Sequence, residues 1–417
     1  MSVEAYTQVT AKLEANRCLM CADPPCACDC PAGVDPRAFI RKIRFDNMDG
    51  AVRMLRSSNV LAGSCARICP SGALCGNKCT AKGLARPIDI RGLQRFVMDW
   101  EMKNGMIEPR SPSREGKDVA VIGAGPAGLG AAAELAIRGH RVTLFERDEA
   151  AGGMLRACIP SFRLPPEVVE FEIAFIKKLG VEIRFGQAID DPKRLISEGS
   201  AAVFISTGLS KSREADFVGR ELPGVYQALD LLRLAKQGVP PELGKRVVVI
   251  GGGDTALDAA RVARKAGSQV LVLYRRTQLE MPAYPEEVDA AWDEGVEFYF
   301  RTVVHSFIGK GNVSGAKCVR VRWRERVRGM AEGYDVEGPE FTVACDSVVM
   351  ALGQGLESDF HLRATPQGLL AVDTQSFATS EEGIFAGGDM VAGGGTAAFA
   401  VGHGKLAAIR MDEYLKR

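Results

Sequence analysis

Cysteines are concentrated near the N-terminus, where their spacing suits the binding of a metal or an iron–sulfur cluster. Nine of the 12 cysteines fall at positions 18 to 79. Their order is Cys18-x2-Cys21-x4-Cys26-x3-Cys30 and then Cys65-x3-Cys69-x5-Cys75-x3-Cys79, with Cys28 inside the first group. Thiolates are soft ligands for zinc and for iron–sulfur clusters. Disulfide bonds are disfavoured, because the polar segment 1–16 lacks the apolar core of a secretory signal.

Two kinds of cysteine site remain open. A zinc site would consist of cysteine alone, because the block contains none of the four histidines. Two [4Fe-4S] clusters are favoured, since Cys26-x3-Cys30-Pro31 repeats the ending of the two-cluster ferredoxin motif. In that motif the last cysteine ligates the other cluster. The spacing therefore predicts the first three cysteines at one cluster and Cys30 at the second, with further ligands from positions 65–79.

A glycine-rich loop follows the first predicted strand, in Val121-Ile-Gly-Ala-Gly-Pro-Ala-Gly128. Gly123 permits a tight turn, Gly125 lets the backbone approach a pyrophosphate, and Gly128 lets helix and strand pack closely. The N–H groups and dipole of the following helix favour the phosphates. Glu146 ends the next strand 23 residues after Gly123, where an acid hydrogen-bonds a ribose hydroxyl. The loop predicts a dinucleotide site.

A second loop of this kind is Val249-Ile-Gly-Gly-Gly-Asp-Thr-Ala256, in which Ala256 replaces the third glycine. Tyr274 lies 23 residues after Gly251 and is followed by Arg275 and Arg276. The acid typical of NAD sites is absent at this point, and arginines stand where a 2′-phosphate would need a partner. The pattern favours NADPH, with NADH as the alternative. Arg275 and Arg276 could instead be ordinary surface residues at the end of a strand, with no role in nucleotide binding.

A third glycine cluster, Gly383-Ile-Phe-Ala-Gly-Gly-Asp389, lies near the C-terminus. A short strand that runs into Gly-Gly-Asp would bring Asp389 close to the first glycine loop if the chain returns to the first sheet. Asp389 could then bind a ribityl hydroxyl of a flavin. We also expect Lys405, or the start of the helix at 396–404, near the flavin ring.

The elements that position these groups follow from hydrophobic periodicity. The first hundred residues are predicted to be helical and irregular, with helices at 35–45 and 50–57. Asp35 caps the former helix, which places Phe39, Ile40 and Ile43 on one face. After a polar linker at 110–117, strand, helix and strand are expected at 118–122, 126–138 and 141–145, and again at 246–250, 255–266 and 269–274. This repeat predicts an α/β fold with two doubly wound, Rossmann-like nucleotide-binding domains behind an α-helical iron–sulfur domain.

Composition excludes several classes of protein. The net charge of +1, with 25% charged and 46% hydrophobic residues, is not that of a disordered or nucleic-acid-binding chain. No apolar run reaches the roughly 18 residues that a membrane span needs. We therefore expect a cytoplasmic protein with no membrane or nucleic-acid partner.

Together these motifs resemble a family of flavoproteins. It includes the small subunit of glutamate synthase, the N-terminal half of dihydropyrimidine dehydrogenase and the electron-input subunit of bacterial NAD(P)-dependent dihydropyrimidine dehydrogenase. Besides the cysteines and the glycine loops, the resemblance is carried by Arg17–Cys21, Gly153–Arg156, Ile159–Pro165, Ser206–Gly208, Tyr274–Arg276 and Gly387–Asp389. It implies a cluster domain at 1–109, an FAD domain at 117–240 and 347–417, and an NAD(P)H domain at 241–346.

The pyrimidine-reducing branch implies a particular set of cluster ligands. The first cluster would be held by Cys18, Cys21, Cys26 and Cys79. The second would be held by Cys30, Cys69, Cys75 and an unusual glutamine, Gln94, in the segment Pro87-Ile-Asp-Ile-Arg-Gly-Leu-Gln94. Cys65 is not a ligand in the family, and Cys28 has no assigned role. Tyr274–Arg276 with Met281-Pro282 is more similar to the glutamate synthase type.

The family also implies a set of residues that bind FAD and NAD(P)H. These are Gly123, Gly125, Ala127, Gly128, Glu146, Gly153, Leu155, Arg156, Thr207, Gly208, Gly251, Gly253, Asp254, Thr255, Ala256, Arg275, Arg276, Gly353, Gly388, Asp389 and Thr396. No catalytic acid or base is expected, because hydride transfer between nicotinamide and flavin needs positioning rather than proton transfer.

The chemistry on an organic substrate is expected to take place on another chain. Disulfide reductases need a cysteine pair beside the flavin, and Cys158 is the one cysteine near the first loop. A (βα)8 barrel of about 250 residues does not fit beside the other parts. The sequence therefore predicts an electron-input subunit that passes electrons from NADPH through FAD and two clusters to a partner subunit. The resemblance to the pyrimidine-reducing branch implies that this partner carries FMN and clusters and reduces uracil or thymine. The alternatives are a glutamate synthase small subunit and a zinc-stapled flavin protein.

Overall fold

The computed structural model describes residues 6–109, 113, 115–239, 241–324 and 333–417. Four residues of the expected linker, Arg110, Ser111, Pro112 and Arg114, lie outside this part of the chain. The chain divides into two compact units. The first unit contains the described residues up to Arg156 together with Ser161–Lys211 and Gly355–Arg417, and the second contains Ala157–Pro160 and Ser212–Gln354.

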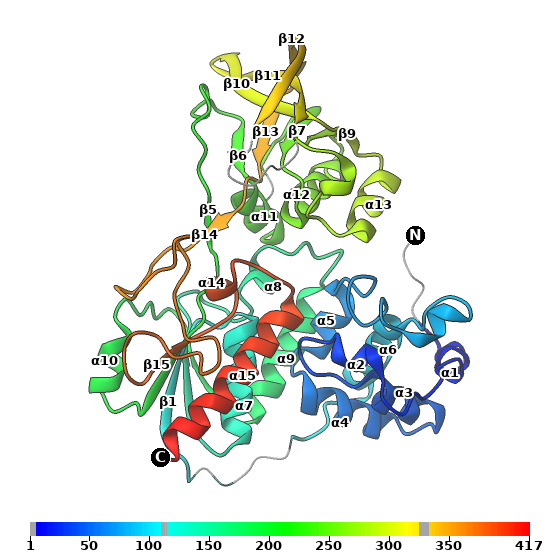
Figure 1. Ribbon diagram of the computed structural model, residues 1–417, viewed down its shortest axis with the longest axis vertical. Helices are drawn as coiled ribbons and strands as arrows, with labels where there is room; N and C mark the ends of the chain where they lie inside the picture. Colours follow the sequence, from blue (N-terminus) through cyan, green and yellow to red (C-terminus); the bar gives the residue numbers. More distant parts are fainter. Residues whose placement is uncertain (1–5, 110–112, 114, 240, 325–332) are drawn as a thin grey trace. The chain divides into compact units, whose positions relative to one another are not determined.

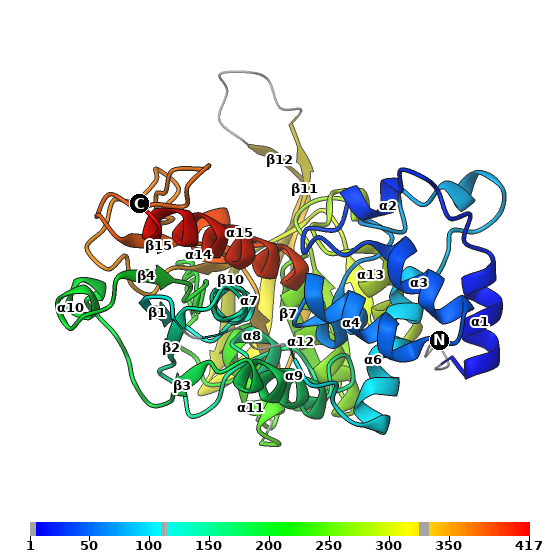
Figure 2. The same ribbon diagram turned by 90° about the horizontal axis from the view of Figure 1, so that it is seen from below.

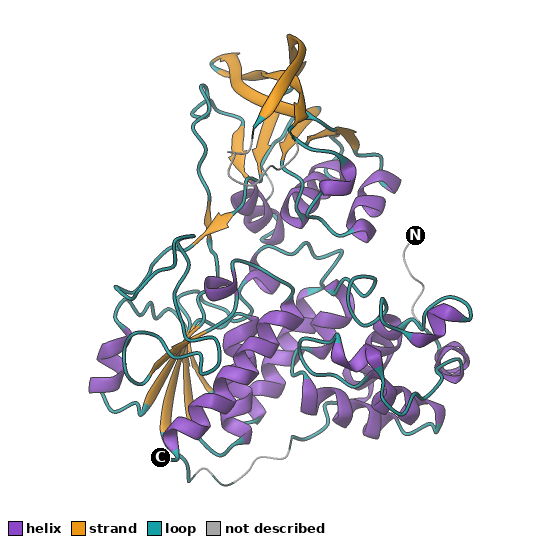
Figure 3. Cartoon of the chain, in the orientation of Figure 1, coloured by secondary structure: helices purple, strands orange, loops and turns teal. Residues whose placement is uncertain are grey.

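The N-terminal part of the first unit is built from helices and loops (Figure 3). Its elements are α1 (Gln8–Asn16), α2 (Pro25–Cys28), α3 (Pro36–Arg44), α4 (Met48–Ser58), α5 (Ala62–Ile68), η1 (Thr80–Gly83) and α6 (Ile90–Asn104). The two helices expected from the sequence correspond to α3 and α4. Asp35 caps α3 by accepting a hydrogen bond from the backbone N–H of Ala38.

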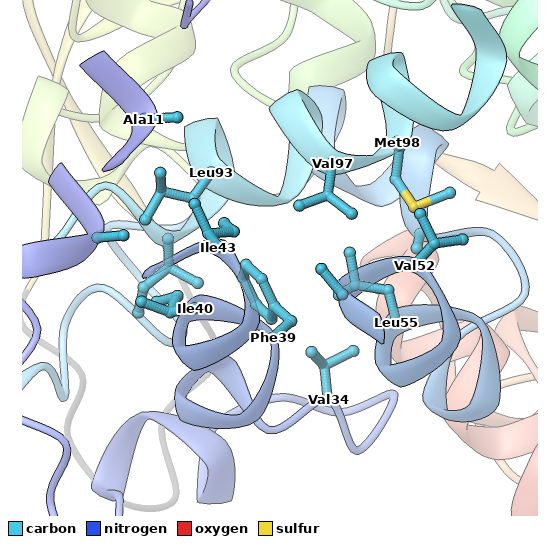
Figure 4. Close-up of a cluster of buried hydrophobic side chains, with 14 of the residues drawn as sticks. Ala11, Val34, Phe39, Ile40, Ile43, Val52, Leu55, Leu93, Val97 and Met98 are labelled. Carbon is cyan, nitrogen blue, oxygen red and sulfur yellow. The ribbon is translucent and has the colours of Figure 1, made fainter. Parts of the chain in front are cut away.

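The core of this helical part lies between α3, α4 and α6. Figure 4 shows Phe39 of α3 facing Leu55 of α4, with Leu93 and Val97 of α6 against them. Phe39 and Leu55 are fully buried, so this face supplies the hydrophobic stabilisation of the helical part. The same helix α6 carries Gln94, whose orientation is thereby fixed by the packing of its neighbours.

The rest of the first unit is a parallel sheet flanked by helices. The described strands stand in the order β15-β4-β1-β2-β3, which places the first glycine loop at the central strand. The strands are β1 (Asp118–Ile122), β2 (Arg141–Phe145), β3 (Glu182–Arg184), β4 (Ala202–Ile205) and β15 (Ile384–Ala386). The helices are α7 (Pro126–Ile137), α8 (Met154–Ala157), α9 (Pro166–Lys178), α10 (Pro192–Ser197), α14 (Asp389–Ala392) and α15 (Ala397–Leu415).

Helices α7 and α15 run side by side at backbone contact (Figures 1 and 2). A Cβ atom built on Gly404 would lie 2.0 Å from the carbonyl oxygen of Ala127, and one built on Gly130 would lie 2.9 Å from that of Val401. Both distances are below van der Waals contact, so this approach requires glycine at both positions. The contact ties the C-terminal helix to the helix that follows the first glycine loop.

The second unit contains a second parallel sheet of the order β6-β13-β7-β8-β9 and an antiparallel sheet of the order β10-β11-β12. The parallel strands are β6 (Val225–Gln227), β7 (Arg246–Ile250), β8 (Gln269–Leu273), β9 (Glu297–Tyr299) and β13 (Ser347–Met350). The antiparallel strands are β10 (Thr302–Lys310), β11 (Asn312–Trp323) and β12 (Tyr334–Ala344). The helical elements are α11 (Ala228–Lys236), α12 (Asp254–Lys265), η2 (Gln278–Glu280) and α13 (Pro285–Asp293), and the short strands β5 (Lys211–Ser212) and β14 (Gln354–Gly355) lie where the chain passes between the units.

The second unit is larger than the segment 241–346 that the sequence predicts for the NAD(P)H domain. Strand β13 pairs with both β7 and β6, so the sheet recruits one strand before and one strand after that segment. Such pairing depends on distant parts of the chain and leaves no local sign in the sequence. Within the described ranges, no helix is long and apolar enough to cross a bilayer.

The contact between α7 and α15 yields a stability prediction. We expect Gly404→Ala to lower the free energy of unfolding by about 1–3 kcal/mol, because the added methyl group forces two backbones apart. Gly83→Ala is the matched control, since a Cβ there meets no atom within 4 Å. Thermal unfolding of the flavin-loaded proteins measures the difference. Equal melting temperatures for the two variants would contradict the packing argument.

Candidate cofactor sites

In the first glycine loop, an added side chain would collide with neighbouring atoms at Gly123 and Gly128 but would meet free space at Gly125. Gly123 has a φ of +94°, and a Cβ on it would lie 2.8 Å from the carbonyl oxygen of Ser206. A Cβ on Gly128 would lie 1.9 Å from the oxygen of Gly123, whereas one on Gly125 would meet no atom within 4 Å. Gly125 is the N-cap of α7, so free N–H groups point into this open space. The geometry suits a phosphate group at Gly125.

Glu146 stands beside this loop at the end of β2. Its Oε2 accepts a hydrogen bond from the backbone N–H of Ala124 at 2.7 Å, and its Oε1 accepts one from Asp148 at 3.0 Å. Burial raises the pKa of this carboxyl, and the two N–H groups lower it. Each carboxylate oxygen has a second lone pair, which is available to a hydroxyl donor such as a ribose.

Several candidate residues from distant segments converge on the same loop. A Cβ on Gly153 would lie 2.8 Å from Cα of Gly125, and one on Gly388 would lie 2.8 Å from Cβ of Ala127. The chain thus returns to the first loop at Gly388, as the sequence predicts. Around Gly208, with a φ of +68°, no atom would contact an added Cβ within 4 Å.

Asp389 has an unmet hydrogen-bonding requirement. Its Oδ1 is buried and has no hydrogen-bond partner among the described residues. Burial raises the pKa of this carboxyl to about 6. Thr207 lies near it, donating from Oγ1 to Sδ of the adjacent Met390 at 3.9 Å. A buried acceptor without a donor is costly, so the residues present fit a ligand that brings a hydroxyl to Asp389, as the ribityl chain of FAD does.

Other candidates have structural partners in this form of the protein. Leu155 is buried, and Arg156 forms an ion pair with Glu170 at 3.1 Å. Thr396 caps α15 by accepting the N–H of Phe399 at 3.1 Å. Gly353 lies in the second unit, where its carbonyl accepts the N–H of Arg213 at 2.9 Å.

The second glycine loop, in the second unit, has the same features: a glycine packed against a backbone carbonyl and a glycine at the N-cap of the following helix. Gly251 has a φ of +143°, and a Cβ on it would lie 2.4 Å from the carbonyl oxygen of Ala351. Gly253 is the N-cap of α12, and its added Cβ would contact only Cγ of Pro282, at 3.9 Å. Ala256 is fully buried at the position of the third glycine. The open side of this loop again lies at a helix N-terminus.

The side chains that follow Gly253 are held by hydrogen bonds. Asp254 accepts the backbone N–H of Tyr284 at 3.1 Å through Oδ1. The hydroxyl oxygen of Thr255 accepts from the side-chain amide of Gln354 at 3.3 Å. These contacts orient the first turn of α12.

Arg275 and Arg276 share an aromatic partner that the sequence did not single out. Their guanidinium carbons lie 5.1 and 5.0 Å from the ring centroid of Trp323, at the end of β11. The indole N–H of Trp323 also donates to the carbonyl of Arg275, and Tyr334 packs edge-on against the ring at 5.4 Å. Trp323 ends β11 and pairs with Tyr334 of β12, so the position of the indole ring is fixed by the antiparallel sheet. Its ring thereby keeps the guanidinium groups of Arg275 and Arg276 close to each other.

The cysteines of the first predicted cluster lie near one another. Burial, together with the neighbouring Cys79 and Cys18, raises the pKa of the Cys26 thiol to about 12. Burial also raises the pKa of Cys18, which has Cys79 and Cys21 as neighbours. The Cys21 thiol donates to Oγ1 of Thr80 at 3.5 Å. Four thiols from two separate segments thus face a common region, which fits the ligand demand of a cluster.

Of the predicted ligands of the second cluster, Cys75 is the one that the structure places near Cys30. The sulfur of Cys30 accepts hydrogen bonds from the backbone N–H groups of Val34, Ala32 and Gly33, which partly offset the rise in pKa caused by burial. Burial raises the pKa of Cys75 to about 12, with Cys30 as its nearest charged neighbour. N–H groups around a sulfur stabilise its thiolate form, so Cys30 is prepared for ligation.

Gln94 is buried on α6 and oriented by one hydrogen bond. Its side-chain nitrogen donates to the carbonyl of Ala62 at 2.7 Å, which leaves the amide oxygen as the group that can face a metal. The free thiols of Cys69 and the buried Cys65 share a hydrogen bond. Cys28 is exposed.

Comparisons with known proteins identify the family. The sequence model of pyridine nucleotide-disulphide oxidoreductases matches residues 117–404. The chain belongs to this family. Residues 2–106 match the domain described as dihydropyrimidine dehydrogenase domain II, 4Fe-4S cluster. The chain is an NAD(P)H-dependent flavin and iron–sulfur oxidoreductase, with FAD and [4Fe-4S] clusters as cofactors, and the zinc alternative loses its support.

Curated relatives match over nearly the whole chain. The NAD-dependent dihydropyrimidine dehydrogenase subunit PreT of Escherichia coli (strain K12) is 36% identical, over 99% of this chain and 96% of its own length. The glutamate synthase [NADPH] small chain of Azospirillum brasilense is 33% identical, over 99% and 90%. The NADP(+)-dependent formate dehydrogenase subunit beta of Moorella thermoacetica is 37% identical over 94% of this chain, which spans 60% of that relative.

A solved structure agrees on the fold. FprA from Mycobacterium tuberculosis in complex with NADPH has a TM-score of 0.61 and 18% identity, and the match covers 72% of this chain and 84% of FprA. The expected α/β fold with Rossmann-type nucleotide-binding regions and an N-terminal cluster domain is confirmed. The three cysteines of the nucleotide-binding region, Cys158, Cys318 and Cys345, are buried free thiols.

Asp389 yields a prediction with opposite effects on stability and flavin binding. The carboxyl has a raised pKa in the folded apoprotein, so the folded state loses stability as the pH rises from about 4 through about 6. We expect Asp389→Asn to stabilise the apoprotein by about 1–3 kcal/mol at pH 8 and to have little effect at pH 4. FAD affinity should fall about tenfold, because an amide oxygen is a weaker acceptor than a carboxylate. Chemical unfolding of the apoprotein and fluorescence titration with FAD measure the two effects.

A second prediction concerns Trp323. We expect Trp323→Leu to raise KM for NADPH about 5- to 10-fold, since two cation–π contacts of roughly 0.5–1 kcal/mol each are lost. KM for NADH should change less than twofold. Arg275→Ala is the reference variant, and Trp292→Leu, at another half-exposed tryptophan of the same unit, is the control. Steady-state oxidation of NADPH and of NADH with ferricyanide as electron acceptor measures KM for each nucleotide. A wild type that prefers NADH, or an Arg275→Ala variant with unchanged NADPH kinetics, would contradict the assignment.

Proposed function

We propose that this chain is the electron-input subunit of an NAD(P)H-dependent dihydropyrimidine dehydrogenase. It takes electrons from NADPH and passes them through FAD and two [4Fe-4S] clusters to a partner subunit. The partner, a separate chain with FMN and clusters, reduces uracil or thymine to the 5,6-dihydropyrimidine. The observation that carries the proposal is Gln94, buried on α6 with its amide oxygen available for a metal. The similarity to PreT over 99% of the chain supports it.

Each part of the chain has one task in this scheme. Residues 1–109 hold the clusters, the sheet of the first unit supplies the FAD site, and the second unit supplies the NADPH site. When bound, the flavin accepts a hydride from the nicotinamide and passes on single electrons. The relatives PreT and the glutamate synthase small chain are named as subunits, which supports a separate partner.

The protein itself contributes orientation and electrostatics. The N-terminus of α7 and the carboxylate of Glu146 would fix the adenosine diphosphate half of FAD, and Asp389 would fix the ribityl chain. In the second unit the N-terminus of α12 would bind the pyrophosphate of NADPH. Arg275 and Arg276 would select the 2′-phosphate, because two guanidinium groups held by one indole ring can present donors to a doubly charged group.

The second candidate is the small subunit of a glutamate synthase. Tyr274–Arg276 and Met281-Pro282 favour it, and the small chain of Azospirillum brasilense is 33% identical. The cofactors and the electron path would be the same in both candidates. Only the partner and its substrate differ, so the choice depends on the final acceptor.

Metal content and partner assays test the proposal. Anaerobically purified protein should contain about eight irons and eight labile sulfides per chain. Zinc without sulfide would refute the cluster assignment. The chain co-purified with its native partner should oxidise NADPH when uracil is added. Oxidation that requires glutamine and 2-oxoglutarate instead would refute the pyrimidine assignment and establish the second candidate.

A further inference from the structure

A half-buried lysine of the flavin-binding part contacts the loop that surrounds Cys30. The ammonium group of Lys405, on α15, donates to the carbonyl of Ser58 at 2.7 Å and to that of Ala32 at 3.3 Å. The helix backbone reaches the same loop, because a Cβ on Gly402 would lie 2.1 Å from the carbonyl oxygen of Pro31. All of these residues belong to the first unit, so the contact is internal to one compact body.

The loop held by Lys405 is the one that hydrogen-bonds the sulfur of Cys30. The backbone N–H groups of Ala32, Gly33 and Val34 point to this sulfur. Lys405 binds the carbonyl side of Ala32 while Cys30 accepts from the amide side. A displacement of this side chain would therefore alter both the charge near Cys30 and the direction of the N–H groups.

The charges around Lys405 are few. Its two hydrogen-bond acceptors are neutral carbonyls. Its charged neighbours are Glu134 on α7 and Cys30 itself. Glu134 has the larger electrostatic influence on Lys405, but it is also paired with Arg138 at 2.8 Å, and Cys30 is the second group that interacts with the ammonium charge. In a partly buried setting such a charge acts over several ångströms with little screening.

The same turn of α15 also contacts the flavin-binding loop. The ring nitrogen Nδ1 of His403 accepts the backbone N–H of Gly388 at 3.4 Å. His403 and Lys405 are two residues apart, so one short stretch of helix fixes the segment before Asp389 and the loop around Cys30. An electron path from flavin to cluster requires such a fixed separation.

We propose that Lys405 is a positioning residue that raises the reduction potential of the second cluster, the one ligated by Cys30. The inference rests on the proposed function and its ligand set. A cluster gains a negative charge on reduction, so a nearby cation and oriented N–H groups favour the reduced form. Lys405 thereby makes this cluster a better acceptor for electrons that arrive from the flavin.

The test is a redox titration of the anaerobic, fully loaded chain, monitored by electron paramagnetic resonance. The signal altered by Gln94→Cys identifies the second cluster. At a fixed potential, Lys405→Met should lower the ratio of reduced to oxidised second cluster about tenfold, which equals a shift of about 59 mV for one electron. Lys405→Arg should keep the ratio within about threefold. Lys193→Met, which removes an exposed charge paired with Glu381, is the control and should change nothing.

The outcomes separate the alternatives. An unchanged midpoint in Lys405→Met, with wild-type iron and FAD content, would overturn the inference. Loss of the second-cluster signal in Lys405→Met but not in Lys405→Arg would support it, whereas loss in both variants would count against it. Wild-type protein without labile sulfide would refute the proposed function and this inference together, before any variant is compared.

Discussion

The backbone contact between α7 and α15 is the constraint on which the first unit depends. Glycines at positions 130 and 404 let the two helices approach until backbone meets backbone. Helix α7 begins at the first glycine loop, and α15 carries the residues that reach Gly388 and the Cys30 loop. If α15 were displaced by the thickness of a methyl group, Gly388 and the Cys30 loop would both shift relative to the first glycine loop.

A buried ionic network makes a second connection between the helical part and the flavin-binding sheet. Arg56 of α4 pairs with Glu101 of α6 at 2.9 Å and approaches Glu172 of α9 at 3.5 Å. Glu172 also accepts the backbone N–H of Gly63 at 2.6 Å. Burying three charges costs desolvation energy, and removing one partner would leave the others uncompensated. The network therefore favours a single arrangement of the helical part against α9, which explains why both parts form one compact unit.

Local features could be predicted from the sequence, and distant pairings could not. Strands at 118–122, 141–145 and 246–250 match β1, β2 and β7, because apolar runs and glycine turns are written in consecutive residues. The return of the chain to the first loop at Asp389 was also expected.

The membership of β6 and β13 in the second sheet, and the stacking of Trp323 on two arginines, depend on residues up to 123 positions apart. Lys405 was expected near the flavin ring, and that placement stays a prediction. The contacts of its ammonium group with the carbonyls of Ala32 and Ser58 could not be predicted, because these residues lie about 350 positions away in the sequence. Gln94 came from family resemblance, because no spacing rule marks a glutamine as a metal ligand.

The segments that carry the cysteines have little else to hold them in place. Between Arg17 and Pro31, all of which the structure describes, no residue is buried, and the stretch from Ser71 to Arg86 buries only Gly76 and Ala81. Apolar burial therefore contributes little stability to these loops. Their thiols, by contrast, are desolvated enough that the pKa values of Cys26 and Cys75 reach about 12, so at neutral pH the folded protein without iron holds protonated thiols. Binding of iron replaces these protons and supplies the positive charge that the desolvated sulfurs lack. The free energy of cluster binding is thus also the free energy that orders the loops, and the helical core of α3, α4 and α6 serves as the base on which they are fixed.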